Sequence, residues 1–359
     1  MIPIIFQRKQ NLASLEFIWN KFCNYSYKLE LYLFFMKNIE ILLVDEKQLP
    51  KMDFCGIFAT PNYFYLQMEE DSEAECEQFN IKKIGEFYDK KLIKIGEAYG
   101  DAVTIGDDFF SLDDYNLNHF LGDKIIKTVE PDVFSGHKNF EFADIGTDGK
   151  FLYIDTSKRK SFMLLDKDFN ILSKVKQEDG AYYFSSEGAF FISNDDESNT
   201  YKKYVNGKLE KELVLSNSLC RLDLLYKIVE LSLNPDSSED WKIKKEINEN
   251  PYPFHSFSGG GGIYSLMSNG HIFYPTENGS IDLGNDWMQN EDEGGGTTYT
   301  SKYAILFSNN KAGVFADGKI VGQVDLPIKT EKIRGLSSDG KFVYALLKGD
   351  ILQRYIILE

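Results

Sequence analysis

The chain has 359 residues, of which 43 % are hydrophobic and 14 % aromatic, and its formal net charge at pH 7 is -16. This length suits either one closed β architecture or two average domains, and the hydrophobic content is enough for a substantial core. The acidic balance repels phosphate backbones and acidic membrane surfaces, so the sequence predicts neither nucleic acid nor membrane as a partner.

Cys23, Cys55, Cys76 and Cys220 are scattered, with no Cys-x-x-Cys pair and no histidine close by in the sequence, so no zinc site is predicted. The N-terminal run MIPIIFQRKQ lacks the order and the length of a secretion signal. No apolar stretch approaches the roughly 18 to 20 residues that a membrane helix needs. We therefore expect a cytoplasmic protein without a metal or a cofactor.

Residues 1–35 differ from the rest of the chain. They carry four basic and two acidic side chains, and their apolar positions follow no clean helical stripe. Met36 then begins MKNIEILLVDEK, which alternates as a strand does. Two interpretations of residues 1–35 stay open: a mis-annotated or dispensable extension before a true start at Met36, or a docking helix. Residues 36–359 are expected to form a single domain.

A turn-and-strand pattern recurs in chain order after Met36. Small or polar residues, a glycine and an alternating aromatic strand surround Gly149, Gly188, Gly270 and Gly340, and weaker copies without the glycine surround Asn62, Asp108, Lys227 and Lys302. Successive copies lie about 30 to 46 residues apart, which is typical of four-stranded blades with variable loops. Eight such units fit the chain, or seven if residues 219–249 are an insertion.

Four strands can be assigned within one unit, because NFEFADIG, KFLYIDTS, SFMLLDKD and NILSKVK follow one another between residues 139 and 176. The next unit repeats this arrangement between residues 181 and 215. Short loops favour antiparallel neighbours, and such sheets stacked around an axis form a β-propeller. The expected fold is therefore all-β, a propeller of seven or eight four-stranded blades. A two-domain β-sandwich protein is the alternative.

The last unit offers only three strands, KIRGLSS, KFVYALLK and ILQRYIIL, before Glu359. The strand IEILLVD at residues 39–45 would supply the missing outer strand and close the ring. In this closure the chain resembles WD-repeat and related propellers, which combine strands from both ends of the chain in one blade. It lacks the Gly-His and Trp-Asp dipeptides of WD repeats and the repeated double glycine of kelch repeats, so the resemblance implies only the architecture.

Four consecutive glycines, residues 259–262, form the segment that most resembles a phosphate-binding loop. A strand pattern follows them, however, with neither the lysine nor the helix that such a loop requires. Gly262 lies eight residues before Gly270, and Gly180 lies eight before Gly188. We therefore interpret the run as a glycine-rich entry to the innermost strand of a blade, next to the central opening.

Aromatic and histidine side chains in turn-rich loops flank this run, and such side chains often contact peptides or carbohydrates. The candidate ligand-binding residues are Tyr252, Phe254, His255, Gly260, Gly261, His271 and Trp287. The alternative interpretation is that these rings pack between adjacent blades.

No pattern marks a catalytic residue, because Gly-x-Ser-x-Gly and His-Glu-x-x-His are both missing from the sequence. The segment DKDFN at residues 166–170 begins like a calcium loop but lacks its turn glycine, so a solvated hairpin is expected there. No metal ligand is assigned.

These observations predict a monomeric, non-catalytic scaffold or binding protein that holds a protein or peptide partner on one face of the propeller. The alternative is a propeller enzyme acting on a glycan or small molecule at the axis, with carboxylates and a histidine from the inner strands. Convergent carboxylates with shifted pKa values would favour the enzyme. A flat apolar face around an empty or plugged channel would favour the scaffold.

Overall fold

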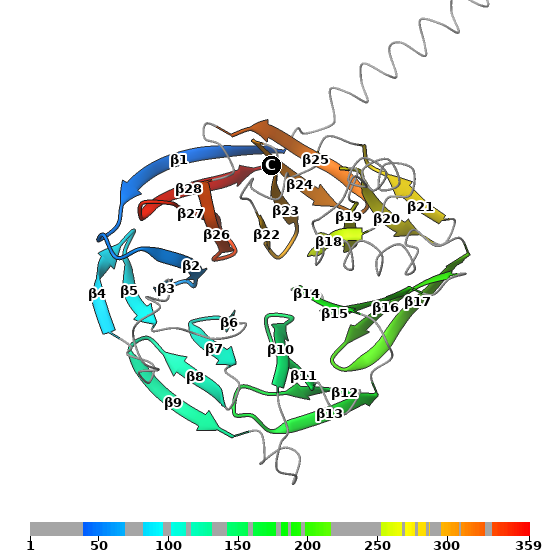
Figure 1. Cartoon of the computed structure of the whole chain (residues 1–359), viewed down its shortest axis with the longest axis horizontal. Coiled ribbons are helices and arrows are strands. Elements are labelled where there is room, and N and C mark those ends of the chain that lie inside the picture. Colours follow the sequence, from blue (N-terminus) through cyan, green and yellow to red (C-terminus); the bar gives the residue numbers. More distant parts are fainter. Residues whose placement is uncertain are drawn as a thin grey trace, which may run out of the picture. The chain divides into compact units, whose positions relative to one another are not determined.

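The computed structural model describes residues 39–68, 82–95, 102–112, 116–130, 142–156, 161–176, 181–185, 188–194, 198–216, 253–267, 270–276, 279–284, 287, 296–308, 310–326 and 332–359. Their strands form seven four-stranded sheets, arranged as the blades of a β-propeller between Glu40 and Leu358 (Figure 1). Residues 217–252, which contain the irregular unit of the sequence, lie outside the described residues. No described helix has the length and apolar character to cross a membrane.

The blades are numbered in chain order, and the strands of each are given from the axis outward. Blade 1 contains β2 (Phe54–Ala59), β3 (Tyr63–Met68), β5 (Lys90–Ile95) and β4 (Lys82–Phe87). Blade 2 contains β6 (Ala102–Ile105), β7 (Asp108–Leu112), β8 (Leu117–Leu121) and β9 (Lys124–Val129). Blade 3 contains β10 (Phe142–Thr147), β11 (Leu152–Thr156), β12 (Ser161–Leu165) and β13 (Ile171–Lys176). Blade 4 contains β14 (Ala181–Ser185), β15 (Gly188–Asn194), β16 (Ser198–Val205) and β17 (Lys208–Ser216); blade 5, β18 (Pro253–Gly259), β19 (Gly262–Met267), β20 (Ile272–Thr276) and β21 (Gly279–Asp282). Blade 6 contains β22 (Gly296–Tyr299), β23 (Ala304–Ser308), β24 (Lys311–Ala316) and β25 (Lys319–Asp325); blade 7, β26 (Ile333–Ser338), β27 (Phe342–Leu347), β28 (Ile351–Leu358) and β1 (Glu40–Gln48).

The sequence of each strand reflects its distance from the axis. The second strand of a blade is covered by neighbouring blades on both faces, so it is a nearly continuous apolar run, as in the fully buried β19 and β23. The outer strand faces solvent and carries lysines, as in β9, where five of the six residues are exposed. The hydrophobic core therefore lies between the blades.

Aromatic side chains dominate these interfaces. Between blades 1 and 2, the ring of Tyr65 stacks on that of Phe109, with the ring centroids 4.7 Å apart. Between blades 7 and 1, Tyr344 meets Phe64 edge-on at 4.8 Å. Offset and edge-on ring pairs of this kind add to the free energy gained from burial alone, and the 28 Phe and 21 Tyr of the chain supply them.

A tyrosine on the second strand fastens some blades to the next one. The Tyr65 hydroxyl donates to the Asp107 carbonyl at 2.8 Å and accepts from the Gly122 amide at 2.9 Å, in the turn between the third and fourth strands of blade 2. Tyr264 of blade 5 accepts from the amide of Gly318 in blade 6 at 3.4 Å. These hydroxyls satisfy turn groups that would otherwise be buried without partners.

The predicted closure of the ring is confirmed. Strand β1 pairs antiparallel with β28, from Glu40 opposite Leu358 to Gln48 opposite Ile351. The Arg354 guanidinium contacts the carboxylate of Asp45 through two hydrogen bonds, of 3.1 and 2.9 Å. The strands assigned from sequence in blades 3, 4 and 7 are present as predicted, with ends shifted by a few residues.

Blade 1 departs from the consecutive order expected from sequence. Strand β5 lies between β3 and β4, and its pairing with β3 is parallel. A parallel pair needs a crossover of about a dozen residues, and residues 69–81 separate β3 from β4. Residues 69–81 of this crossover lie outside the described residues.

The prediction assigned the glycine turn of blade 5 to the wrong pair of strands. Gly149 and Gly340 follow the inner strands β10 and β26, as predicted, whereas Gly270 lies between the second and third strands of blade 5. The inner turn of blade 5 is Gly260–Gly261 instead. A four-stranded blade contains several glycine turns that look alike in sequence, so the spacing of glycines alone does not identify the hairpin.

Candidate functional site

A cavity of about 550 Å³ lies at the axis, at the end of the ring where the inner strands terminate. The described residues that line it come from six blades, and they are residues 58–61, 102–104, 106, 145–147, 149, 257–258, 297–301 and 336–340. Its volume is within the range of about 300 to 1,000 Å³ that is typical of ligand pockets. The inner strands and the turns that follow them therefore form a site on one face of the propeller.

Several hydroxyl groups at the cavity serve the fold. Thr147 Oγ1 donates to the Phe151 carbonyl at 2.7 Å and accepts from the Gly149 amide at 3.0 Å. Ser338 makes the same two bonds in blade 7, at 3.0 and 3.1 Å. Such side chains satisfy the backbone groups of the turn between the inner and second strands, so their protons are not available to donate to a ligand.

Blades 3 and 7 share the sequence [Thr/Ser]-Asp-Gly-Lys-Phe-x-Tyr at this turn. In blade 3, Asp148 Oδ1 accepts from the amides of Lys150 and Phe151 at 2.9 and 2.8 Å, and Oδ2 accepts from the Tyr153 hydroxyl at 2.9 Å. In blade 7 the Asp339 carboxylate makes the corresponding three bonds, at 2.9, 2.8 and 2.8 Å. The sequence repeat thus encodes a repeated structure in which an aspartate organises the turn.

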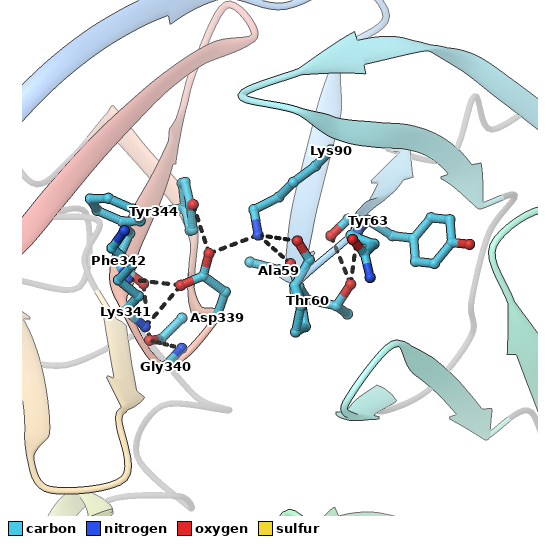
Figure 2. Close-up of polar contacts among 12 residues, drawn as sticks. Ala59, Thr60, Tyr63, Lys90, Asp339, Gly340, Lys341, Phe342 and Tyr344 are labelled. Atoms are coloured by element: carbon cyan, nitrogen blue, oxygen red, sulfur yellow. Dashed lines mark hydrogen bonds and ion pairs between the residues drawn. The ribbon is translucent and has the colours of Figure 1, made fainter.

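Blade 7 adds a buried ion pair to this turn (Figure 2). Lys90 of blade 1 lies 2.7 Å from Asp339 Oδ2, and its Nζ also donates to the carbonyls of Thr60 and Pro61. Burial by itself would raise the pKa of the Asp339 carboxyl, but the hydrogen bonds from Lys90 and from the turn amides lower that pKa below its usual value. Asp339 therefore remains ionised and is already neutralised by Lys90.

Other hydroxyls at the cavity have no hydrogen-bond partner among the described residues. They are those of Thr104 on β6, Thr298 and Tyr299 on β22, and Ser301 in the following turn. Burial raises the pKa of Tyr299 to about 12, and the Asp148 carboxylate of blade 3 raises it further. Tyr299 is therefore protonated at neutral pH and presents a hydrogen-bond donor at the axis.

The glycine run has a structural role in blade 5. The Gly260 carbonyl accepts from the Asp317 amide at 2.6 Å, so the turn docks against the outer turn of blade 6. A Cβ on Gly260 would lie 2.3 Å from the Phe315 carbonyl oxygen, and one on Gly261 would lie 2.4 Å from Asp317 Oδ1. The interpretation as fold geometry holds, although the run joins the innermost strand to the second strand and does not precede the innermost one.

The remaining candidate binding residues do not gather around the cavity. Phe254 and His255 lie near the start of β18, and His271 precedes β20, so all three are at the end of blade 5 opposite the cavity. His271 is paired with Asp282, 2.9 Å away. Tyr252 lies outside the described residues.

Trp287 packs between blades, as the alternative interpretation expected. It is 2 % exposed and lies 5.5 Å from Phe315 between ring centroids. Gly313 makes room for it, because a Cβ there would lie 2.5 Å from the indole.

The calcium-like segment forms a tight turn between β12 and β13. Asp166 Oδ1 accepts from the amides of Asp168 and Asn170, at 3.0 and 2.8 Å. Lys167 from this turn contacts Asp108 of blade 2, which also pairs with His119 at 2.8 Å. Within the described ranges, no group of three His, Cys, Asp or Glu side chains is placed to hold a metal ion.

Sequence reasoning missed the cavity hydroxyls and the Lys90–Asp339 pair. The segment GTTYTS at residues 296–301 was visible as a hydroxyl-rich strand beside a glycine run, and its place at the end of an inner strand was the available signal. No signal joins Lys90 to Asp339, because they are 249 positions apart and meet only when the ring closes.

No protein-family model matches the chain, and no curated protein matches it in sequence. Among solved structures it is similar to PorZ, a surface component of the type-IX secretion system of Porphyromonas gingivalis, with a TM-score of 0.51 and 8 % identity. That likeness covers 87 % of this chain and only 38 % of PorZ. The chain is also similar to a catalytically inactive virginiamycin B lyase from Staphylococcus aureus with quinupristin, with a TM-score of 0.50 and 11 % identity over 89 % of this chain and 100 % of the lyase. At such identities these likenesses show the β-propeller fold alone, and the resemblance to WD-repeat propellers is one of architecture.

Proposed function

We propose that this propeller is a non-catalytic binding protein that holds a peptide segment of a protein partner in the axial cavity. The observation that carries the proposal is a set of hydroxyls around a cavity of about 550 Å³, those of Thr104, Thr298, Tyr299 and Ser301, which have no hydrogen-bond partner in the described part of the chain. A peptide has regularly spaced amide donors and acceptors, which neutral hydroxyls can satisfy without the desolvation cost of a buried charge.

The ionisable groups of the cavity support binding over acid–base catalysis. In the described lining the carboxylate of Asp339 is already paired with Lys90. The raised pKa of Tyr299 keeps its proton in place at neutral pH. A general base needs a free group with a pKa near the working pH, and neither side chain meets that requirement.

The apolar residues of the lining complement the hydroxyls. Phe58, Ile145, Phe257 and Leu336 contribute to the cavity from four different blades. Pockets that combine apolar walls with a few placed polar groups bury side chains and fix their orientation. The expected ligand is therefore a short segment with uncharged residues inside the cavity.

An affinity pull-down from lysate of the native cells tests the proposal, with bound proteins identified by mass spectrometry. The bait is the full chain, compared with Thr298→Trp, which fills the cavity, and with Ile126→Trp, which places the same side chain on outer strand β9. Ile126 is 52 % exposed and lies away from the cavity lining, so this control tests for non-specific effects of the added ring.

A stoichiometric partner that the wild type and Ile126→Trp retain and Thr298→Trp loses would support the proposal. Retention of the same partner by Thr298→Trp would contradict it. Depletion of a small molecule from a cell extract by the wild type, blocked by Thr298→Trp in the absence of any protein partner, would instead favour the enzyme alternative.

A further inference from the structure

We infer that the bound segment carries Asp or Glu side chains on both sides of its uncharged part, and that these carboxylates pair with Lys150 and Lys341 at the cavity mouth. The inference rests on the proposed peptide-binding function and names the chemistry of the segment.

The two lysines occupy equivalent positions in the repeated turns of blades 3 and 7. Each follows a glycine that lines the cavity, Gly149 or Gly340, and each is exposed. Lys150 Nζ lies 4.7 Å from the centroid of the Phe151 ring, and Lys341 Nζ lies 4.9 Å from that of Phe342. Contact with the ring face holds an ammonium group in place while leaving its protons available.

Neither lysine forms an ion pair with a described residue. The aspartate two positions before each lysine is already occupied: Asp148 by two turn amides and the Tyr153 hydroxyl, and Asp339 by the same kind of contacts and by Lys90. The carboxylates of the turns are thus engaged, whereas the two ammonium groups have no carboxylate partner within the described ranges and can receive an anion from a ligand.

The positions of the two lysines indicate how the ligand crosses the mouth. Their turns follow β10 and β26, which lie on opposite sides of the central opening (Figure 1). One small anion cannot reach both sides at once. A segment with an acidic residue at each end of an uncharged stretch can engage both lysines while its middle occupies the hydroxyl-lined cavity.

The charge of the whole chain restricts where such a segment can bind. The formal net charge is -16, so most of the surface repels an acidic peptide. The ammonium groups of Lys150 and Lys341 at the cavity mouth attract such a peptide locally. This favours binding in one place and one orientation, because charge complementarity contributes more to specificity than to affinity.

Selection from a random peptide library displayed on phage tests the inference with defined proteins. The immobilised targets are the full wild-type chain, the double variant Lys150→Gln/Lys341→Gln, and the control Lys124→Gln/Lys319→Gln. The control removes two exposed lysines from β9 and β25, outside the cavity lining. Circular dichroism and the urea midpoint verify that all three proteins are folded.

On the wild type and on the control, enriched peptides are expected to carry Asp or Glu on both sides of a short uncharged stretch. Two exposed ion pairs imply that such peptides bind the Lys150/Lys341 double variant about twofold to thirtyfold more weakly. Enriched peptides without acidic bias, or with equal affinity for all three proteins, would overturn the inference and leave the proposed function standing. No enrichment on any target would overturn the peptide-binding proposal itself.

Discussion

The ammonium group of Lys90 lies 2.7 Å from Oδ2 of Asp339, and both side chains are 7 % exposed. The pair joins blade 1 to blade 7, the blade that combines strands from both ends of the propeller. Lys90 also lies 5.6 Å from the Phe64 ring and 5.8 Å from the Tyr344 ring. Removing the counterion of a buried charge costs much free energy of folding. The pair therefore determines how the stability of the junction responds to mutation and to pH.

Replacing Asp339 should destabilise the protein more than replacing its structural equivalent in blade 3. Asp339→Asn leaves the Lys90 charge buried without its counterion, and breaking such a pair costs about 3 to 5 kcal/mol. Asp148→Asn disturbs the equivalent turn of blade 3 but leaves no buried lysine without a counterion, so its cost should be about 1 to 3 kcal/mol. Urea unfolding followed by circular dichroism measures both free energies. Equal losses would show that the ion pair contributes nothing beyond the turn.

The stability of the junction should fall as the solution becomes acidic. The pKa of Asp339 is lowered in the folded protein, so its stabilising contribution is complete above the unfolded pKa of about 4 and is lost as pH falls through the lower folded value. The urea midpoint of the wild type should therefore drop as the pH falls below about 4, and that of Asp339→Asn should drop less. Parallel curves for the two proteins would contradict this assignment.

Alanine should be poorly tolerated in the glycine turn of blade 5. Gly260 has a φ of 54°, and an added Cβ would meet the backbone oxygen of Phe315. Gly106 has a φ of 63° with open space around it, so Gly106→Ala measures the left-handed conformation alone, about 1 to 2 kcal/mol. Gly260→Ala should cost clearly more than this control in the free energy of unfolding. A cost no larger than that of Gly106→Ala would mean that the turn relaxes away from blade 6.

The clash at Gly261 should be relieved by a second substitution, which provides an internal check. Its Cβ would meet the side-chain oxygen Asp317 Oδ1, so Asp317→Ala should recover part of the loss caused by Gly261→Ala. The double-mutant cycle measures this coupling free energy. Additive losses would show that Asp317 is not the obstacle.

Removing the tyrosine hydroxyl between blades 1 and 2 should weaken that interface without disturbing its packing. Tyr65→Phe deletes both the bond to Asp107 and the bond from Gly122, and leaves a buried amide without a partner. The expected loss is about 1 to 3 kcal/mol. Tyr264→Phe should cost less, because the hydroxyl's bonds to the Gly260 carbonyl and from the Gly318 amide are longer, at 3.3 and 3.4 Å. The reverse order in urea unfolding would refute this ranking.

The predicted boundary near Met36 can be examined by truncation. A chain that begins at Met36 retains β1 in full, whereas one that begins at Leu49 lacks the strand that pairs with β28. The first should unfold at the urea concentration of the full chain, and the second should lose stability and expose the edge of β28. A lower midpoint for the chain starting at Met36 would show that residues 1–35 contribute to stability, as the docking-helix interpretation holds.

Much of the architecture could be predicted because each blade repeats a local pattern. The turn before Lys150 and the turn before Lys341 have nearly the same sequence and the same hydrogen bonds, so a local signal led to the correct hairpins. Gly270 was misplaced because its turn has the same composition as an inner turn. The crossover in blade 1 was missed because strand order depends on pairing, which the spacing of strands does not reveal.

By itself, the sequence determined the all-β class, most strand positions and the sharing of blade 7 between both ends of the propeller. It also determined that the glycine run serves the fold. Each of these depends on local periodicity or on turn chemistry. Only the tertiary structure decided that there are seven blades, that Lys90 meets Asp339, and that Thr104 and Tyr299 share one cavity. The reason is physical: the inner strands are distant in sequence, and the side chains that line the axis come together only when the blades complete the ring.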